Sequence, residues 1–418
     1  MGNRSSLDRR VVVSGMGAIT PLGNDVETFW SGCVEGRSGI GPIDLFDASD
    51  LPCRIAGQAW CFNPRDWLSE KQARRLGRFA QMAVAATLQA VAAAGLRMEE
   101  EDPGRIGVIL GNGSGGMPMM GDQVMVSHKK GWAYCDPLVL LKTLPDMATA
   151  QISSLLGATG HIGTVSASCT SGAMAIGQAM DVIRSKRADV VVAGGAEAWI
   201  SEIGLGSFCL LRALSTSNDT PKRASRPFDA HRDGFVPAEG AAMLVIESLE
   251  HARARNAPIL AEVAGFACTA DAGNLVAPPA EAASAARAIT LALDDANLSA
   301  EDIDYVSAHG TSTPLNDIAE TQALKAALGE RAYQIPISAT KSLIGHSLGA
   351  AAAIETVASI KTIETGLIHP TINLDDPDPK CDLDYVPNTA RQASVRNVLN
   401  VSFGFGGQNA CLVLKECR

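Results

Sequence analysis

The sequence lacks the patterns that mark several common protein classes. None of its ten cysteines forms a C-x-x-C pair, which leaves a zinc ribbon or a thioredoxin-like redox site without support. No apolar run reaches the roughly 18 residues that span a bilayer, and no secretory signal precedes the first predicted strand. We therefore expect reduced thiols, a cytoplasmic location and no membrane partner.

Basic residues are scarce as well. Lys and Arg number 35 against 45 Asp and Glu, which gives a net charge of −10 and argues against a general nucleic-acid binder. The Gly-rich segment 111–116 (GNGSGG) lacks the Lys-Ser/Thr ending of a phosphate-binding loop, so it predicts no nucleotide site. With 46% hydrophobic and 19% charged residues, the 418-residue chain is globular and long enough for a bilobed fold or two domains.

Candidate strands and helices alternate from end to end. The first half has apolar strands at 11–13, 106–110, 189–193 and 241–246, and a long helix pattern over 72–94. A second round has strands at 261–266, 303–308, 335–339, 397–402 and 410–414, and helices at 280–296 and 350–363. Continuous apolar runs separated by helices indicate an α/β protein whose sheet is covered on both faces.

The two halves resemble each other where each half ends. Segments 237–248 (PAEGAAMLVIES) and 405–416 (FGGQNACLVLKE) both place small residues before an apolar strand, which indicates an internal duplication. The polar segment 215–235 is expected to be a long functional loop rather than a linker.

Cys169 lies in the segment SASCTSG (166–172), where a predicted strand meets a predicted helix. The apolar residues that follow recur at helical spacing, namely Ala173, Ile176, Met180 and Ile183. A cysteine at a helix N-terminus feels the positive end of the helix dipole and faces free N–H groups, and both effects favour the thiolate. A buried structural cysteine is the alternative, but this elbow of small residues favours a nucleophile.

Two histidines follow later strands. His309 comes directly after the strand at 303–308, at the edge of an α/β sheet where ligands are usually bound, although a helix-capping loop is the alternative. His346 lies just before a predicted helix, where the dipole keeps an imidazole neutral. Lys341 and Glu355 flank this apolar stretch, and beside two histidines a paired, buried role is favoured over a surface one.

A serine motif overlaps the second histidine. Residues 345–349 (GHSLG) satisfy the G-x-S-x-G elbow of α/β-hydrolases. In that fold the acid and then the histidine follow the serine, and here only His369 follows. A serine hydrolase is therefore a minor alternative.

The segment 403–409 (FGFGGQN) is too rich in Phe and Gly for a normal strand. Glycine permits close backbone approach, and Phe403 or Phe405 is a candidate gate of a pocket. A β-bulge is the structural alternative.

This ordered set of motifs resembles the β-ketoacyl-[acyl carrier protein] synthases of the thiolase superfamily, and in particular their type II class, which elongates long acyl chains. The resemblance extends from VVVSGMGAITPLG (11–23) to FGFGGQNACLVL (403–414). It implies a duplicated thiolase-like α/β fold with five layers, α/β/α/β/α, normally assembled as a homodimer. It places the nucleophilic cysteine in an N-terminal half, residues 10–256, and the two histidines in a C-terminal half, residues 257–416.

The resemblance also implies catalytic roles. Cys169 matches the nucleophile that accepts the acyl group as a thioester, and His309 and His346 match the pair that acts on the malonyl thioester. Lys341 and Glu355 match the charged residues that support this pair. The implied reaction is a decarboxylating Claisen condensation with malonyl-[acyl carrier protein], which releases CO2 and elongates a fatty-acid chain as its 3-oxoacyl thioester. It needs no metal and no redox cofactor.

Other matched positions concern binding. Phe405 matches the gate whose backbone N–H completes an oxyanion hole with that of the nucleophile. Thr311 and Thr313 match the threonines that hold the phosphopantetheine arm, and Phe403 is assigned to the same substrate site. Ser114 stands where relatives tend to carry an apolar residue that lines the acyl pocket, which leaves the chain-length preference open.

The implied partner is acyl carrier protein, an acidic molecule. Lys71, Arg74 and Arg75 match family positions that dock the carrier, and with Arg78 they lie close together on one predicted helix. Arg212, in a predicted loop, matches a further docking position. A solvated helix face is the structural alternative.

The sequence departs from the family at some positions. SASCTSG replaces the more frequent Thr-Ala-Cys-Ala, and Ala238 replaces a usual glycine, but no reacting group is lost. A catalytically silent chain-length partner shares the fold but usually lacks the cysteine. A modular polyketide ketosynthase needs domains that 418 residues do not hold, whereas a stand-alone polyketide or specialised-lipid synthase remains open.

Overall fold

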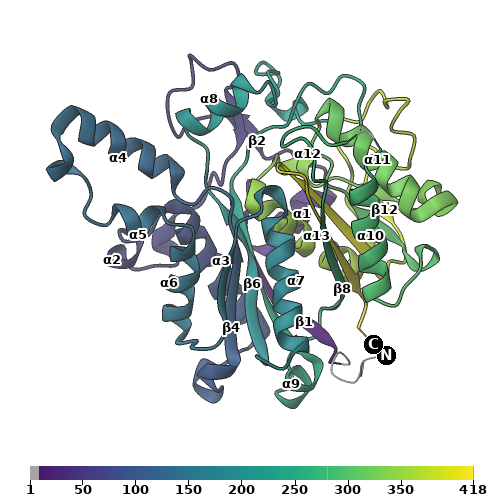
Figure 1. The fold of residues 1–418 in the computed structure, drawn as a ribbon, viewed down its shortest axis with the longest axis horizontal. Coiled ribbons are helices and arrows are strands. Elements are labelled where there is room, and N and C mark those ends of the chain that lie inside the picture. Colours follow the sequence, from purple (N-terminus) through teal and green to yellow (C-terminus); the bar gives the residue numbers. More distant parts are fainter. Residues whose placement is uncertain (1–8, 280, 418) are drawn as a thin grey trace.

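The computed structural model describes residues 9–279 and 281–417, which form one ten-stranded mixed sheet with helices packed on it (Figure 1). The strands of its first half are β1 (Val11–Ile19), β4 (Ile106–Gly111), β5 (Ile162–Val165), β6 (Val190–Glu197) and β7 (Gly240–Ser248). Those of its second half are β8 (Ala261–Ala270), β9 (Tyr305–Ser307), β10 (Ile337–Ser338), β13 (Asn397–Gly404) and β14 (Gln408–Lys415).

The two halves of the sheet have the same topology. One half runs β5-β4-β6-β7-β1 and the other β10-β9-β13-β14-β8, and they join where β1 pairs with β8. In each half the first three strands pair in parallel and the last two pair antiparallel. The segments 237–248 and 405–416 contain β7 and β14, which occupy equivalent places. The predicted duplication is confirmed.

Helices form three further layers around the two half-sheets. The outer layer on the first half consists of α3 (Arg78–Ala94) and α6 (Asp146–Leu156), and on the second half of α10 (Ala283–Asp295) and α11 (Pro314–Leu328). Between the halves lie α7 (Ser171–Arg184) and α13 (Ala351–Thr365), which contact strands of both. Every residue from Ala351 to Thr362 is buried, as expected of a helix enclosed on all sides. The layers run α/β/α/β/α.

Strand β1 is longer than its predicted apolar core at 11–13, because its glycines belong to the strand. A Cβ on Gly15 would lie 2.2 Å from the carbonyl oxygen of Ala90, and one on Gly17 would lie 2.0 Å from that of Ala86. Both carbonyls belong to α3, so the glycines let this helix pack directly on the strand backbone.

The single helix predicted over 72–94 is wrong, since the structure has two helices there. The short α2 (Glu70–Ala73) begins with a capping box formed by Ser69 and Gln72. The longer α3 begins after Gly77, where a Cβ would lie 2.2 Å from the Lys142 carbonyl oxygen. The chain turns at this point because the backbone must pass close to a neighbouring segment.

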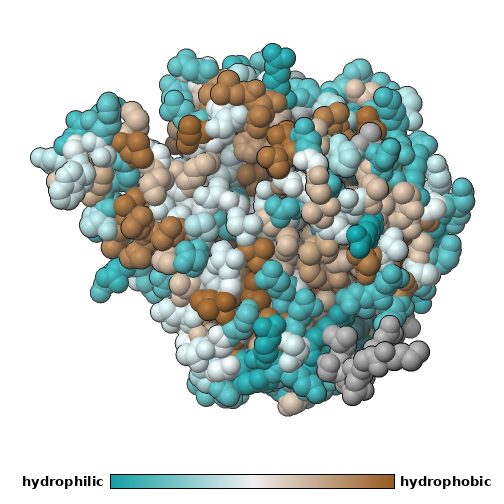
Figure 2. Space-filling model, in the orientation of Figure 1, coloured by the Kyte–Doolittle hydropathy of each residue, from teal (hydrophilic) through white to brown (hydrophobic). Residues whose placement is uncertain are grey.

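After β4 the chain forms a helical arm, defined here as α4 (Met117–Lys130), the turn Trp132–Tyr134 and α5 (Val139–Thr143). The arm projects from the body in Figure 1, and Figure 2 shows hydrophobic residues gathered on it. None of the described residues of α4 is buried. The exposed apolar side chains of the arm are Met120, Val124, Met125, Trp132, Tyr134, Leu140 and Leu141.

The remaining helices and strands are short. They are α1 (Val26–Val34), α8 (Glu202–Leu210), α9 (Leu249–Ala254), α12 (Lys341–Ile344), β2 (Ile40–Pro42), β3 (Ile55–Gly57), β11 (Leu367–Ile368) and β12 (Arg391–Gln392). Segment 215–235 contains one 3-10 turn, Pro221–Arg223, and is otherwise irregular, as expected. Across the described ranges, no helix combines the length and apolar character needed to cross a membrane.

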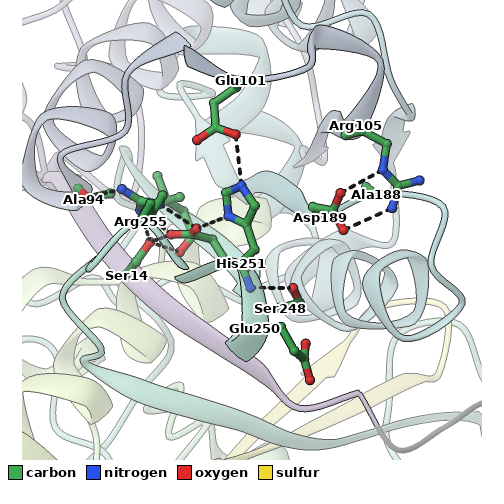
Figure 3. Close-up of polar contacts among 12 residues, drawn as sticks. Ser14, Ala94, Glu101, Arg105, Ala188, Asp189, Ser248, Glu250, His251 and Arg255 are labelled. Atoms are coloured by element: carbon green, nitrogen blue, oxygen red, sulfur yellow. Dashed lines mark hydrogen bonds and ion pairs between the residues drawn. The ribbon is translucent and has the colours of Figure 1, made fainter. Parts of the chain in front are cut away.

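Hydrogen bonds around His251 tie the end of β7 to its surroundings (Figure 3). Glu247 receives hydrogen bonds from Ser14, Arg255 and His251, and the other ring nitrogen of His251 lies 2.9 Å from Glu101. Burial opposes ionisation of Glu247, but these hydrogen bonds outweigh it and lower its pKa to about 2. The Glu247 hydrogen bond, and then Glu101, raise the pKa of His251 against the effect of burial.

Candidate active site

Cys169 lies in a 3-10 turn, Ser168–Thr170, between β5 and α7. Ser168 has a φ of 50°, in the left-handed region that residues other than glycine seldom adopt. The Ser171 hydroxyl holds the turn, since it accepts from the Ala167 N–H at 2.9 Å and donates to the Ser168 carbonyl at 2.7 Å. The predicted elbow is therefore present, and Cys169 is only 6% exposed.

The fold brings both histidines to this cysteine. Nε2 of His346 lies 3.0 Å from the sulfur of Cys169. The His309 ring stands edge-on to the His346 ring, with 5.4 Å between ring centroids. All three side chains are buried, and one ligand atom from each lies within 4.8 Å of the other two. These residues are far apart in the sequence. They meet because the end of β9, the loop after α12 and the start of α7 lie at one edge of the sheet.

Lys341 and Glu355 form a buried ion pair beside the histidines. Nζ of Lys341 lies 3.3 Å from Nδ1 of His309. Burial and then the Lys341 charge lower the pKa of His309 well below its usual range, so His309 is neutral. Because an ammonium group only donates, Nδ1 accepts this hydrogen bond and the proton of His309 is on Nε2.

His346 is held by its backbone rather than by its ring. Its N–H donates to the Val236 carbonyl at 2.7 Å, and its own carbonyl accepts from the Ala238 N–H at 2.9 Å. Burial and then Lys341 lower the pKa of His346 well below its usual range. The sequence predicted a neutral imidazole from the helix dipole, and the structure makes desolvation the main cause.

The prediction of a resting thiolate is wrong. Burial raises the pKa of the Cys169 thiol to about 12, and neither the charge of Lys341 nor the Phe405 N–H outweighs it. The helix dipole alone does not ionise a sulfur that is this far from water. The thiol proton must therefore leave as the sulfur reacts, and Nε2 of His346 is the nearest base.

The segment 403–409 is a hairpin that joins β13 to β14, which corrects the expectation that it cannot form strand. Gly406 and Gly407 have φ of 88° and 70° and make the turn. A Cβ on Gly404 would lie 3.3 Å from the Cys169 nitrogen, so glycine lets the hairpin approach the elbow. The N–H of Phe405 donates toward the Cys169 sulfur, and this N–H and that of Cys169 are the two oxyanion-hole donors that we predict.

A cavity of about 340 Å³ leads from Cys169 to the surface. The predicted pantetheine-binding residues Thr311 and Thr313 line it, and their hydroxyls lie 3.0 Å apart. Phe403 also lines it, with its ring edge-on to His309 at 5.8 Å between centroids.

Ser114, predicted at the acyl pocket, does not line this cavity. Its hydroxyl and N–H bind the buried carboxylate of Glu197. Glu197 also accepts from the N–H groups of Gly113 and Gly349, at 2.8 and 3.0 Å. Burial raises the pKa of Glu197 against these hydrogen bonds. Sequence reasoning missed Glu197, although an acid that ends an apolar strand was a usable signal.

The predicted docking residues lie at two exposed places. Lys71 is on α2, and Arg74 and Arg75 are in the turn that follows it. Arg212 follows α8 and lines the mouth of the cavity. Arg78 does not belong to this surface set, because it forms an ion pair with the buried Glu239 at 2.6 Å.

One group of side chains among the described residues has the donor atoms and the spacing of a metal site. The sulfur and nitrogens of Cys169, His309 and His346 match the ligands of zinc. Separately, buried oxygens of Glu355, Asn400 and Ser402 make no hydrogen bond with any residue that the structure describes. Oxygens of this kind favour a hard cation over a transition metal.

The serine-hydrolase alternative is wrong. Ser347 is buried, and its hydroxyl forms no hydrogen bond within residues 9–279 and 281–417. His369, the one histidine after it, instead contacts Ser338 and Thr340. A nucleophilic serine needs a base within hydrogen-bonding distance, and Ser347 has none among these residues.

Comparisons with known proteins agree with this geometry. The family described as beta-ketoacyl synthase matches residues 8–252 with its N-terminal domain and residues 260–375 with its C-terminal domain. A 3-oxoacyl-[acyl-carrier-protein] synthase 2 of Synechocystis is 45% identical over 98% of both chains. A solved beta-ketoacyl synthase of Burkholderia phymatum is 38% identical, with a TM-score of 0.92 over 98% of this chain and 100% of that one.

A second solved structure contains a type II polyketide acyl-carrier protein with its ketosynthase bound to the hexaketide. It is 36% identical, with a TM-score of 0.91, and covers 98% of this chain and 100% of that one. A duplicated thiolase-like fold with a cysteine beside two histidines defines the class of ketosynthases. Within that class, the chain belongs to the beta-ketoacyl synthase family.

Proposed function

We propose that the protein condenses an acyl group on Cys169 with malonyl-[acyl carrier protein] in fatty-acid chain elongation. The products are 3-oxoacyl-[acyl carrier protein] and CO2. The observation that carries this proposal is the 3.0 Å contact between the Cys169 sulfur and Nε2 of His346, beside His309 and at the inner end of an apolar cavity.

The first step transfers the acyl group to the enzyme. The Cys169 sulfur attacks the thioester carbonyl while His346 takes the thiol proton. The N–H groups of Cys169 and Phe405 stabilise the tetrahedral oxyanion. As this intermediate collapses, His346 returns the proton to the leaving pantetheine thiolate, so that a free carrier thiol and an acyl-enzyme result.

The second step uses malonyl thioester in the same cavity. When CO2 leaves, the electron pair of the broken C–C bond is shared between the α-carbon and the thioester oxygen, which gives an enolate. His309 donates to that oxygen from Nε2, and His346 can do so once its proton is on Nε2. Because Nδ1 of His346 bonds to none of the described residues, its tautomer is free to change. The α-carbon then attacks the acyl-Cys169 carbonyl, the Cys169 thiolate leaves, and a proton from solvent restores the thiol.

This chemistry involves no external oxidant or reductant, and N–H donors stabilise the negative charge that develops on oxygen. We therefore propose that the protein needs no cofactor. We also propose a cytoplasmic location, which the ten free cysteines support.

We propose acyl carrier protein as the macromolecular partner. The support is the exposed basic set of Lys71, Arg74, Arg75 and Arg212, of which Arg212 lies at the cavity mouth. A chain of net charge −10 repels an acidic carrier at most other places, so a local basic set guides its approach.

We propose a homodimer formed through the helical arm and β5. The arm exposes apolar side chains that a monomer leaves in water, and β5 is an edge strand whose Ile162 is 52% exposed. Light scattering should show a dimer that Leu140→Glu with Leu141→Glu converts to monomer. A monomeric wild type at micromolar concentration would contradict the proposal.

Intact-mass spectrometry tests the condensing activity directly. The protein is mixed with acyl carrier proteins that bear different acyl groups, and an acyl adduct on Cys169 is expected that Cys169→Ala abolishes. Malonyl carrier should then release this adduct as 3-oxoacyl carrier. If no acyl donor yields an adduct, the proposed function is wrong.

A further inference from the structure

Trp199 is the largest fully buried side chain among the described residues. It lies two residues after the end of β6. Its indole N–H donates to the Ala238 carbonyl at 2.9 Å. The N–H of the same Ala238 donates to the His346 carbonyl. The indole is thus anchored to the segment that positions His346.

An aromatic column connects Trp199 to the reacting groups. The Trp199 ring meets the edge of Phe208 at 5.0 Å between centroids, and Phe208 stacks on Phe405 at 5.9 Å. Phe235 packs against Phe208 at 5.4 Å and against His346 at the same distance. The rings of Phe405, Phe208 and Phe235 therefore connect the reacting groups to Trp199.

The column forms part of the cavity wall. Phe208 and Phe405 are among its lining residues, whereas Trp199 is not, because it lies behind Phe208. Thr311 and Thr313 also line the cavity, and in the proposed function they hold the pantetheine arm of each carrier. An acyl group that waits on Cys169 must leave the pantetheine site clear for the malonyl arm, and we place it toward Phe405, whose N–H faces the sulfur, and Phe208 behind it.

We propose that Trp199 is the inner wall of the acyl site and restricts the acyl groups on Cys169 to short chains. The inference rests on the proposed condensation. Movement of Phe405 would free roughly the space of one phenyl ring next to the sulfur. The next layer is Phe208 backed by an indole that has no exposed surface and is fixed by its hydrogen bond. A long acyl chain would need the indole to leave, which a well-packed core resists.

The experiment measures the chain-length profile of acylation. Wild type, Trp199→Phe and Trp199→Ala are each incubated with acetyl, butyryl, hexanoyl, decanoyl and hexadecanoyl carrier protein, and the rate of adduct formation on Cys169 is followed by mass. Wild type should favour butyryl and hexanoyl over hexadecanoyl. In the variants the ratio of the hexadecanoyl rate to the butyryl rate should rise by about tenfold or more.

The ratio of the hexadecanoyl rate to the butyryl rate distinguishes a change of specificity from a loss of stability. A poorly packed variant loses both rates together and leaves their ratio unchanged. If Trp199→Ala does not fold, Trp199→Phe carries the test. Trp30→Phe is the matched control, since Trp30 is also buried but packs against His369 away from the cavity; its ratio should equal that of wild type. Equal wild-type rates for butyryl and hexadecanoyl, or an unchanged ratio in a folded Trp199 variant, would overturn the inference. Absence of every adduct would instead overturn the proposed function.

Discussion

Lys341 fixes the tautomer of His309 through a 3.3 Å contact with its Nδ1. Glu355 pairs with the same ammonium group, so a buried chain of charges supports one histidine of the site. The other, His346, has no described partner at Nδ1. The two histidines are thus unequal: one is a fixed donor, and the other can exchange its proton.

This inequality predicts that Lys341→Met impairs decarboxylation more than acylation. Without the ammonium group, His309 no longer keeps its proton on Nε2 for the enolate oxygen. CO2 release from malonyl carrier should fall roughly 10²-fold, the usual effect of losing one oxyanion donor, while acylation of Cys169 falls less. Because a lone buried Glu355 destabilises the fold, the Lys341→Met, Glu355→Gln double variant is measured in parallel.

Lys361→Met provides the control for this prediction. Lys361 is buried on the same helix as Glu355, and it forms ion pairs with Glu27 and Glu364 rather than with residues of the active site. Its loss should leave the ratio of the two rates unchanged. Equal losses of decarboxylation and acylation in the Lys341 variants would show that Lys341 does not act through His309.

The high pKa of Cys169 predicts slow alkylation at neutral pH. With a pKa of about 12, the thiolate is a small fraction that grows about tenfold for each unit of pH. Labelling by iodoacetamide should therefore accelerate from pH 7 to pH 9 without reaching a plateau. The adduct is quantified by peptide mass, with the exposed Cys61 as an internal reference. A plateau near pH 7 would indicate a thiolate at rest.

Charge reversal on the α2 side should weaken carrier binding alone. Arg74→Glu with Arg75→Glu should raise KM for acyl carrier protein roughly tenfold through lost electrostatic attraction, and the effect should shrink as salt is added. Rates with small acyl thioesters should not change. Lys380→Glu with Arg396→Glu changes the net charge equally at exposed positions elsewhere. A similar rise in KM in both double variants would contradict a local docking site.

The His251 cluster predicts a pH-dependent contribution to stability. Its contacts with Glu247 and Glu101 raise the folded pKa of His251 above the unfolded value. The stabilisation is therefore complete below the unfolded pKa and is lost as pH rises through the folded pKa. His251→Gln should lower Tm more at pH 6 than at pH 9, as measured by calorimetry. If the variant lowers Tm by the same amount at pH 6 and pH 9, His251 stabilises the fold by packing and not by charge.

Much of the site was predictable because its residues follow strands. Cys169, His309 and His346 each come after an apolar run, and topology brings such ends to one edge of a sheet. The hydrogen bonds of Ser114 to Glu197 were not predictable, because a Gly-rich loop does not reveal where its side chains point. The break before Gly77 was missed because Ala-rich periodicity continues through it, while the reason for the turn is a distant carbonyl.

The sequence by itself determined the α/β class, the duplication and the set of reacting side chains. Those properties can be inferred from local periodicity and from the order of motifs. Tertiary structure alone decided the protonation of Cys169, the tautomer of His309 and the aromatic column behind Phe405. These depend on burial and on contacts between segments that are distant in the chain. Desolvation reversed the charge state that the helix dipole predicted for Cys169, because burial of the whole site is a property of the assembled layers.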